Sequence, residues 1–146
     1  MKDMIKVQAG FTMMEIVIVI VILGILSVIA VPKIGDFITT SKIEATKNEM
    51  MILKAALVGE DGYRIDVGSL PAPADIPDAL LTRPAGVPPY DKYTGIGWNG
   101  PYINDDGTGF YNTDAWGNAY VYTSSTITSY GPGGASGGGD DIVLNY

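Results

Sequence analysis

Glu15 is a carboxylate near the start of an apolar run that extends from Phe11 to Val31. A carboxylate inside a membrane-spanning helix costs on the order of 2.5 to 3.5 kcal/mol on insertion scales, so it normally has a cationic partner. The sequence offers no cation nearby, because Lys6 lies beyond the start of the run and Lys33 lies past its far end. The partner of Glu15 is therefore predicted to come from another chain or from processing.

Cleavage between Gly10 and Phe11 would supply such a cation. The new α-amine on Phe11 would lie one helical turn from Glu15, and the same amine on a neighbouring copy could pair with it as well. Gly10, Phe11 and Glu15 are therefore the residues at which the sequence predicts cleavage and charge pairing.

The apolar run has the dimensions of a membrane span. As a helix, Phe11 to Val31 would be about 31 Å long, which matches a hydrocarbon core of about 30 Å. Lys2 and Lys6 precede it, as expected of a cytoplasmic flank. A secretory signal cut after Ala30, or a plain membrane anchor, would share these features, but neither needs a charge inside the run.

The composition excludes several kinds of chemistry. The 146 residues include no cysteine and no histidine, which removes Cys and Ser-His nucleophile systems, disulfides, and zinc sites made of thiolate or imidazole. The 16 acidic residues outnumber the 9 basic residues. Phosphate backbones would repel such a chain, so we expect no nucleic-acid partner, whereas calcium or a basic partner fits better.

One long helix, residues 11–58, is predicted to carry the apolar run. Pro32 removes a backbone donor, which predicts a kink there, and Gly59 is a natural end of the helix. From Asp36 to Val58, spacings of three and four residues predict one amphipathic stripe. The stripe consists of Thr39, Ile43, Thr46, Met50, Leu53 and Leu57. Its C-terminal half is expected to pack on the rest of the protein, and the exposed apolar half of the helix must be buried by lipid or by other subunits.

Residues 59–146 are predicted to form a small head, which makes the fold class α+β. Residues 74–81 can start a short helix with Asp75 as its cap. Residues 84–118 read as a long loop held by large side chains such as Trp98, Tyr102 and Trp116. Three β-rich segments are enough for a three-stranded antiparallel sheet against the helix. These segments are Ala119–Thr123, Thr126–Tyr130 and Ile142–Tyr146.

The segment Gly10-Phe11-Thr12-Met13-Met14-Glu15, followed by an aliphatic run, resembles the class III signal of type IV pilins and type II secretion pseudopilins. This resemblance implies that a prepilin peptidase removes a leader of residues 1–10, that Phe11 is N-methylated, and that Glu15 acts in filament assembly. Four segments of the head resemble the major pseudopilin of type II secretion, the G-type subunit. They lie at residues 62–66, 97–102, 114–120 and 129–142.

The resemblance implies a structural subunit rather than an enzyme. Copies held in the bacterial inner membrane by a single helix, with the head in the periplasm, would polymerise through their N-terminal helices. The filament would move folded proteins out of the periplasm. The implied partners are other copies of the chain, minor pseudopilins, an inner-membrane assembly platform with its cytoplasmic ATPase, and the prepilin peptidase.

The resemblance also implies a calcium site in the last loop. Asp140 and Asp141 match two carboxylate ligands of the family, and Tyr130 matches a carbonyl donor. The position of a further carboxylate is Gly133 here. Losing a charged ligand should weaken the site, unless water, a carbonyl or a carboxylate such as Asp114 replaces it.

Other functions remain open on the sequence. A type IV pilus subunit that forms a surface fibre would share the same helix. A membrane-anchored periplasmic binding module would use the Tyr-, Trp- and Asp-rich loop at residues 84–118 to hold sugar or calcium, and would tolerate Glu15→Ala. A hydrolase is the least favoured, because no spacing places two acidic residues across a cleft.

Overall fold

The computed structural model describes the backbone of residues 10–146, and the side chains of that range except those of residues 29–32. Most of the predicted leader, residues 1–9, therefore lies outside the described part. The chain divides into two compact units, Met1–Ile38 and Thr39–Tyr146, which we call the N-terminal unit and the C-terminal unit. Each is described by itself.

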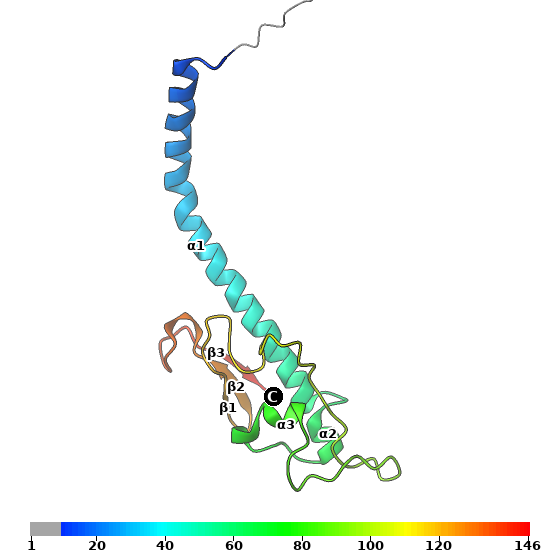
Figure 1. Cartoon of the computed structure of the whole chain (residues 1–146). Coiled ribbons are helices and arrows are strands. Elements are labelled where there is room, and N and C mark those ends of the chain that lie inside the picture. Colours follow the sequence, from blue (N-terminus) through cyan, green and yellow to red (C-terminus); the bar gives the residue numbers. More distant parts are fainter. Residues whose placement is uncertain (1–9) are drawn as a thin grey trace, which may run out of the picture. The chain divides into compact units, whose positions relative to one another are not determined.

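The helix α1 (Met13–Val58) contributes to both units (Figure 1). The predicted start at Phe11 is two residues too early, because Thr12 caps the helix. The Glu15 N–H donates to Thr12 Oγ1 at 3.2 Å and to the Thr12 carbonyl at 3.1 Å. Thr12 and Glu15 have the spacing of a capping box, and an acidic residue in the first turn is favourable with the helix dipole.

The far end of α1 is where the sequence predicts it. The helix ends at Val58, and a side chain on Gly59 would collide with the Ala55 carbonyl oxygen, which accepts the Gly59 N–H at 2.8 Å. This close approach requires glycine. The kink predicted at Pro32 falls among the residues whose side chains are not described, and it stays a prediction.

No single helix among the described residues is both long and apolar enough to pass as a membrane span. The stretches Met13–Val28 and Lys33–Val67 together have sufficient length and apolar composition. This criterion concerns length and composition alone.

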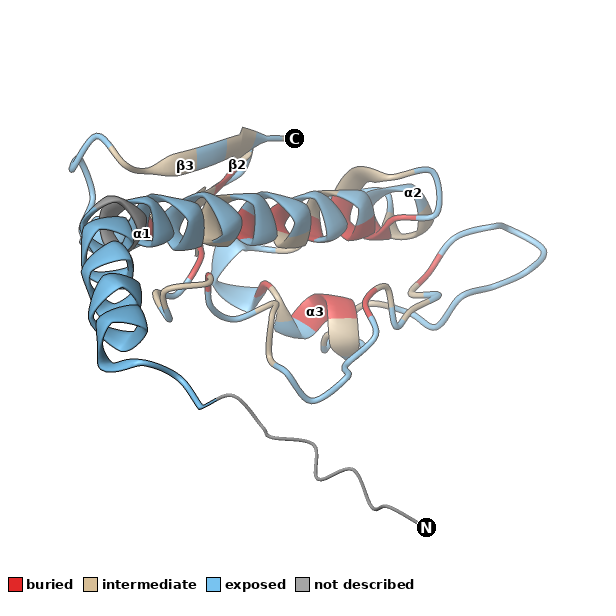
Figure 2. Cartoon of the chain, turned by 90° about the horizontal axis from the view of Figure 1, so that it is seen from above, coloured by how far each residue is buried: buried red, intermediate tan, exposed pale blue. Residues whose placement is uncertain are grey.

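The core of the C-terminal unit forms on one face of α1. Thr46, Met50, Leu53 and Leu57 are fully buried, and Figure 2 shows the buried residues of α1 on one side of the helix. Ile43 is half-buried and Thr39 is exposed. The prediction that the C-terminal half of the stripe packs on the rest of the protein is therefore confirmed.

A three-stranded antiparallel sheet completes this core, which confirms the α+β class. The strands β1 (Val121–Tyr122), β2 (Thr126–Ser129) and β3 (Ile142–Asn145) follow the order β1-β2-β3. Ile127, on the central strand, is fully buried. Each strand is shorter than predicted. The Lys54 ammonium donates to the Asn145 carbonyl at 2.8 Å, which joins β3 to α1.

One local prediction is wrong, and one short helix was not predicted. The predicted helix at residues 74–81 is two pieces, the 3₁₀ turn η1 (Pro73–Asp75) and the helix α3 (Asp78–Leu81). Ile76 separates them in an extended conformation, because a residue that precedes a proline disfavours the helical region. Asp75, the predicted cap, makes no cap hydrogen bond. The helix that was not predicted is α2 (Tyr63–Val67). It ends at Gly68, whose φ of 83° suits a left-handed cap.

Residues 84–118 form a long loop without helices or strands, as predicted, and large side chains hold it. The Trp98 indole N–H donates to the Ala79 carbonyl at 3.0 Å, and Tyr102 packs edge-on against Trp98 with ring centroids 5.9 Å apart. Farther along the loop, the Lys42 ammonium lies 5.9 Å from the centre of the Trp116 ring. A second 3₁₀ turn, η2 (Gly131–Gly133), follows β2.

Candidate functional site

The N-terminal unit exposes nearly all of its described apolar side chains. From Ile16 to Leu26 the large apolar residues are about half exposed, and Phe11 is 77% exposed. One copy of the chain therefore leaves a continuous apolar surface uncovered. Such a surface needs lipid or protein against it.

Glu15 lies within this apolar surface and is itself exposed. In the described part of the chain, no cation lies within salt-bridge distance of its carboxylate. Gly10 and Phe11 precede α1, outside the helix, and both are exposed. The peptide bond between them is thus accessible. Cleavage between Gly10 and Phe11 and the pairing role of Glu15 stay predictions.

The last loop brings together the residues of the expected calcium site. The Asp140 Oδ2 atom accepts the Gly133 N–H at 2.5 Å, and the Asp141 Oδ2 atom accepts the Gly137 N–H at 2.9 Å. The Tyr130 carbonyl accepts the Gly134 N–H at 3.2 Å. A Cβ atom added to Gly133 would lie 2.7 Å from Asp140 Oδ2, so the Asp140 carboxylate fills the space that a side chain at residue 133 would need.

One buried carboxylate oxygen of this loop has no hydrogen-bond partner among the described residues. Asp141 Oδ1 is buried and accepts no hydrogen bond from the described residues. A buried carboxylate oxygen without a donor is costly, and a cation would remove that cost. No three acidic residues cluster in the described chain, so carbonyl groups or water would have to complete the shell of a metal ion here.

A buried acidic residue, Asp114, organises the approach to this loop. Asp114 is only 5% exposed. Oδ1 accepts the N–H groups of Trp116 at 2.9 Å and Asn118 at 2.8 Å, and Oδ2 accepts the Ser129 hydroxyl at 2.6 Å and the Asn118 amide at 3.3 Å. Both oxygens thus accept hydrogen bonds from the protein itself, and Asp114 as a replacement calcium ligand stays a prediction.

The hydrogen bonds continue from Asp114 in two directions. The Asn118 amide donates to the Gly131 carbonyl at 2.7 Å, and the Gly131 N–H donates to Ser129 Oγ at 3.1 Å. The Ala115 N–H donates to Thr46 Oγ1, on α1, at 3.2 Å. One polar network therefore joins α1 to the start of the glycine-rich loop. Its sequence signal is an aspartate followed at two and four residues by backbone donors, an Asx-type turn.

Two tyrosines attach loops to helices through acidic partners. The Tyr120 hydroxyl donates to Glu49 on α1 at 2.8 Å, and the Tyr102 hydroxyl donates to Asp66 on α2 at 3.0 Å. Burial, followed by the Glu49 carboxylate, raises the pKa of Tyr120 well above its ordinary value. Burial and Asp66 raise the pKa of Tyr102 to about 12 against the lowering effect of the Asn99 N–H. Both phenols therefore remain protonated donors at neutral pH.

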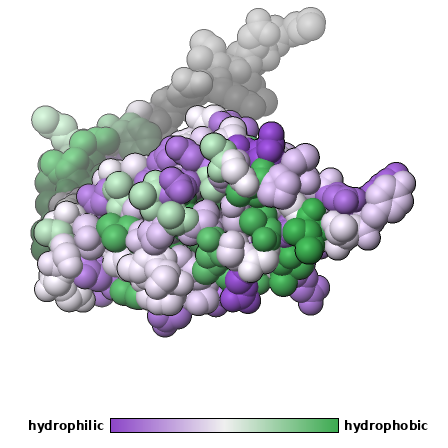
Figure 3. Space-filling model, turned by 90° about the horizontal axis from the view of Figure 1, so that it is seen from below, coloured by the Kyte–Doolittle hydropathy of each residue, from purple (hydrophilic) through white to green (hydrophobic). Residues whose placement is uncertain are grey.

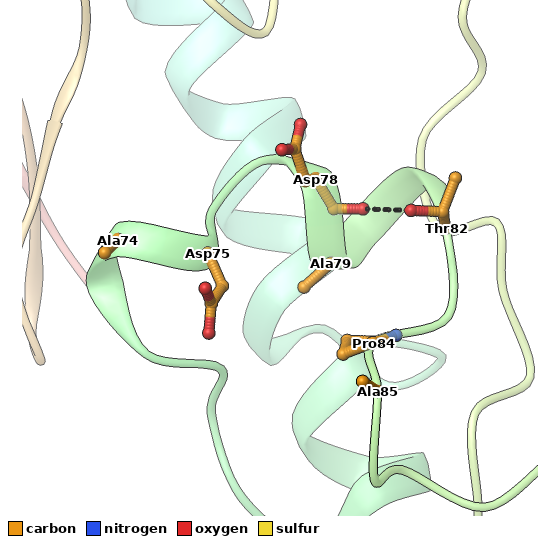
Figure 4. Close-up of a pocket in the computed structure, with 7 residues that line it drawn as sticks. All are labelled: Ala74, Asp75, Asp78, Ala79, Thr82, Pro84 and Ala85. Atoms are coloured by element: carbon orange, nitrogen blue, oxygen red, sulfur yellow. Dashed lines mark hydrogen bonds between the residues drawn. The ribbon is translucent and has the colours of Figure 1, made fainter.

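A pocket of about 290 Å³ next to α3 contains two carboxylates, those of Asp75 and Asp78 (Figure 4). The two side chains point away from each other in Figure 4, and the Thr82 hydroxyl donates to the Asp78 carbonyl at 3.2 Å. This arrangement does not place two acids on opposite sides of a bound molecule, as a paired-carboxylate hydrolase requires.

Comparison with known proteins identifies the family to which the chain belongs. Residues 5–31 match the model of the prokaryotic N-terminal methylation motif. Residues 33–145 match the model of the type II secretion system (T2SS) protein G. The chain belongs to the T2SS protein G family.

The similar proteins support this assignment over nearly the whole chain. The type II secretion system core protein G of Pseudomonas aeruginosa is 31% identical over 140 residues, which cover 92% of this chain and 90% of that protein. The core protein G of Aeromonas hydrophila is 32% identical over 141 residues, 92% of this chain and 90% of that protein. The core protein G of Vibrio cholerae is 31% identical over 151 residues, 97% of this chain and 94% of that protein. Comparison with solved structures gives no match.

The family establishes the kind of function. The expected resemblance is confirmed, and the chain is a structural subunit of a secretion pseudopilus. It is a membrane-associated periplasmic protein that assembles with other components of a secretion system. These matches favour the pseudopilus over the surface pilus and over the binding module.

Proposed function

We propose that copies of this chain polymerise through their N-terminal helices into a periplasmic filament that drives protein export. Residues 11–31 would span the inner membrane once before assembly and form the filament core afterwards, with residues 59–146 as the periplasmic head. The observation that supports this most is the uncovered apolar surface of α1 in the N-terminal unit. Neighbouring helices of the same kind can cover it as well as lipid can.

Processing would prepare the subunit for this assembly. A prepilin peptidase would cut between Gly10 and Phe11, and the freed amine of Phe11, then methylated, would pair with Glu15 of the same or of a neighbouring copy. Two observations support this step: the Gly10–Phe11 peptide is exposed, and no cation among the described residues lies within salt-bridge distance of the Glu15 carboxylate. Minor pseudopilins and an inner-membrane platform would be the other partners, and no residue of the chain would act as a catalyst.

The intact mass of the protein extracted from membranes tests the processing step. We expect a mass lower by residues 1–10 and higher by one methyl group. Gly10→Val, which places a branched side chain at the cleavage site, is the matched variant and should retain the leader. Native protein that keeps Met1 and still polymerises would contradict both the cleavage and the pairing.

We also propose that the loop at residues 130–141 binds calcium through Asp140, Asp141 and the Tyr130 carbonyl. The unpartnered Asp141 Oδ1 supports this, because the folded chain leaves a buried anionic oxygen for an external cation. The absence of a carboxylate at Gly133 makes a weak site the expectation.

Calcium should raise the melting temperature of the full chain in detergent. At 100 times the dissociation constant, a single site stabilises the folded state by about 2.7 kcal/mol. Asp141→Asn should remove most of the calcium-dependent rise, while Asp61→Asn, which changes an exposed acidic residue outside the loop, should keep it. An unchanged melting temperature of the wild-type chain at millimolar calcium would refute the site.

A further inference from the structure

A groove lies between α1 and β3 on the C-terminal unit. It has a volume of about 240 Å³, and its walls are mostly apolar, with Met51, Val143 and Leu144 among them. Met51 is 52% exposed and Val143 is 54% exposed. Glu44 and Lys47, paired with each other at 3.2 Å, line the same groove. The groove thus combines apolar walls with one charge of each sign.

A hairpin at residues 89–98 projects from the same unit (Figure 2). The Tyr90 N–H donates to the Trp98 carbonyl at 3.1 Å, the Asp91 N–H donates to the Ile96 carbonyl at 2.9 Å, and the Tyr93 N–H donates to the Asp91 carboxylate at 2.8 Å. The hairpin is therefore ordered by its own hydrogen bonds.

The tip of this hairpin holds large side chains in solvent. Tyr93 is 86% exposed, Ile96 is 58% exposed and Tyr90 is 40% exposed. The Lys92 ammonium lies 5.0 Å from the centre of the Tyr93 ring, next to Asp91. Aromatic residues on a pre-organised loop bind at low entropic cost, and such residues dominate many interfaces. Figure 3 shows the projection, with apolar surface beside its base.

Groove and hairpin together contain most of the exposed large apolar residues of the C-terminal unit. Of the seven in that unit, three lie on the hairpin and two in the groove, which leaves Ile52 and Ile65. Two different surfaces that complement each other on one molecule make a head-to-tail contact, and such contacts can build open helical polymers. A subunit of a homopolymer needs contacts of this kind.

We propose that the tip of the 89–98 hairpin of one copy docks in the groove between α1 and β3 of a second copy. Tyr93 then packs against Met51, a flexible thioether that makes favourable contacts with aromatic rings. Lys92 and Asp91 approach Glu44 and Lys47, so that each charge meets its opposite. This contact rests on the proposed polymerisation and adds to it a bond between heads, separate from the contact between N-terminal helices.

Cysteine cross-linking in the full chain tests the contact, because the chain has no cysteine of its own. The double variant Tyr93→Cys with Val143→Cys, oxidised with diamide in assembled filaments, should give a ladder of disulfide-linked oligomers. Each single variant should give dimers at most. As a matched control, Tyr93→Cys with Asp61→Cys keeps the hairpin thiol and moves the second thiol to an exposed position outside the groove, and it should give no ladder.

The outcomes separate this contact from polymerisation itself. Filaments visible by electron microscopy without a ladder from the double variant would overturn the docking and leave the proposed function intact, whereas wild-type chains that form no filaments would overturn the proposed function. If the double variant does not fold, charge reversal replaces it. Glu44→Lys should lower filament yield by about tenfold, and Lys92→Glu in the same chain should restore it. A combined variant no better than Glu44→Lys would also overturn the docking.

Discussion

Glu15→Ala is expected to abolish filaments while the C-terminal unit stays folded. The variant removes the carboxylate that would pair with the Phe11 amine of the same or of a neighbouring copy, so the apolar helices lose the contact that fixes their register. Insertion into the membrane should be unchanged or improved, because an acidic side chain in the span costs about 2.5 to 3.5 kcal/mol. Electron microscopy of filaments and a thermal melt of the extracted protein measure the two effects.

Thr12→Ala is the control that separates charge from capping. The backbone N–H of residue 15 donates to Thr12 Oγ1 at the start of α1, so Glu15→Ala keeps this cap and Thr12→Ala removes it. Losing that cap costs about 1 kcal/mol of helix stability but removes no charge, so Thr12→Ala should still form filaments. Normal filaments from Glu15→Ala, or equal loss from both variants, would contradict the pairing role.

Asp114→Ala is expected to cause a large loss of stability in the C-terminal unit. Four donors lose their acceptor at once, of which the Ser129 hydroxyl is buried and the other three are part-buried. A buried donor left unpaired costs roughly 1 to 3 kcal/mol, and the part-buried donors add less because water can reach them. We expect a loss of about 3 to 5 kcal/mol, a large share of the stability of a typical domain. Urea denaturation of the full chain in detergent measures it.

Asp105→Ala is the matched control for this experiment. Asp105 is also an aspartate in an Asx-type turn, but it is exposed, and it accepts the Gly107 N–H at 3.0 Å and a bond from the Tyr111 hydroxyl. Its loss should change the free energy of unfolding by about 0.5 kcal/mol or less. A similarly small effect from Asp114→Ala would show that the network is not what holds the loop to α1.

The parts of the fold that the sequence predicts are those with local patterns. The stripe from Thr46 to Leu57 repeats at helical spacing, so its burial follows from periodicity alone. The end of α1 at Gly59 and the three β-rich segments are local signals too. By contrast, the break of the predicted 74–81 helix at Ile76 depends on one proline, whose effect on the preceding residue overrides the helical pattern.

The candidate sites are predictable to a smaller extent. The Asp114 network joins residues 15 and 69 positions apart in sequence, and no local pattern indicates which serine or threonine completes it. The expected loop residues do come together, but the bond from Gly133 to Asp140 depends on a turn whose geometry only the folded chain defines. The predicted partner of Glu15, the Phe11 amine of the same or of a neighbouring copy, exists only after cleavage, and no cation lies within salt-bridge distance of Glu15 among the described residues.

The uncovered apolar surface of the N-terminal unit has a consequence for how a filament grows. Fully burying one large aliphatic side chain gains about 1.5 to 3 kcal/mol, and these side chains are about half exposed in one copy, so a subunit released into water would lose part of that amount at each of many positions. A pool of dissolved subunits therefore cannot supply the growing end. Each subunit must pass from lipid to its neighbours without an aqueous stage, and elongation should depend on how densely subunits populate the bilayer near the base.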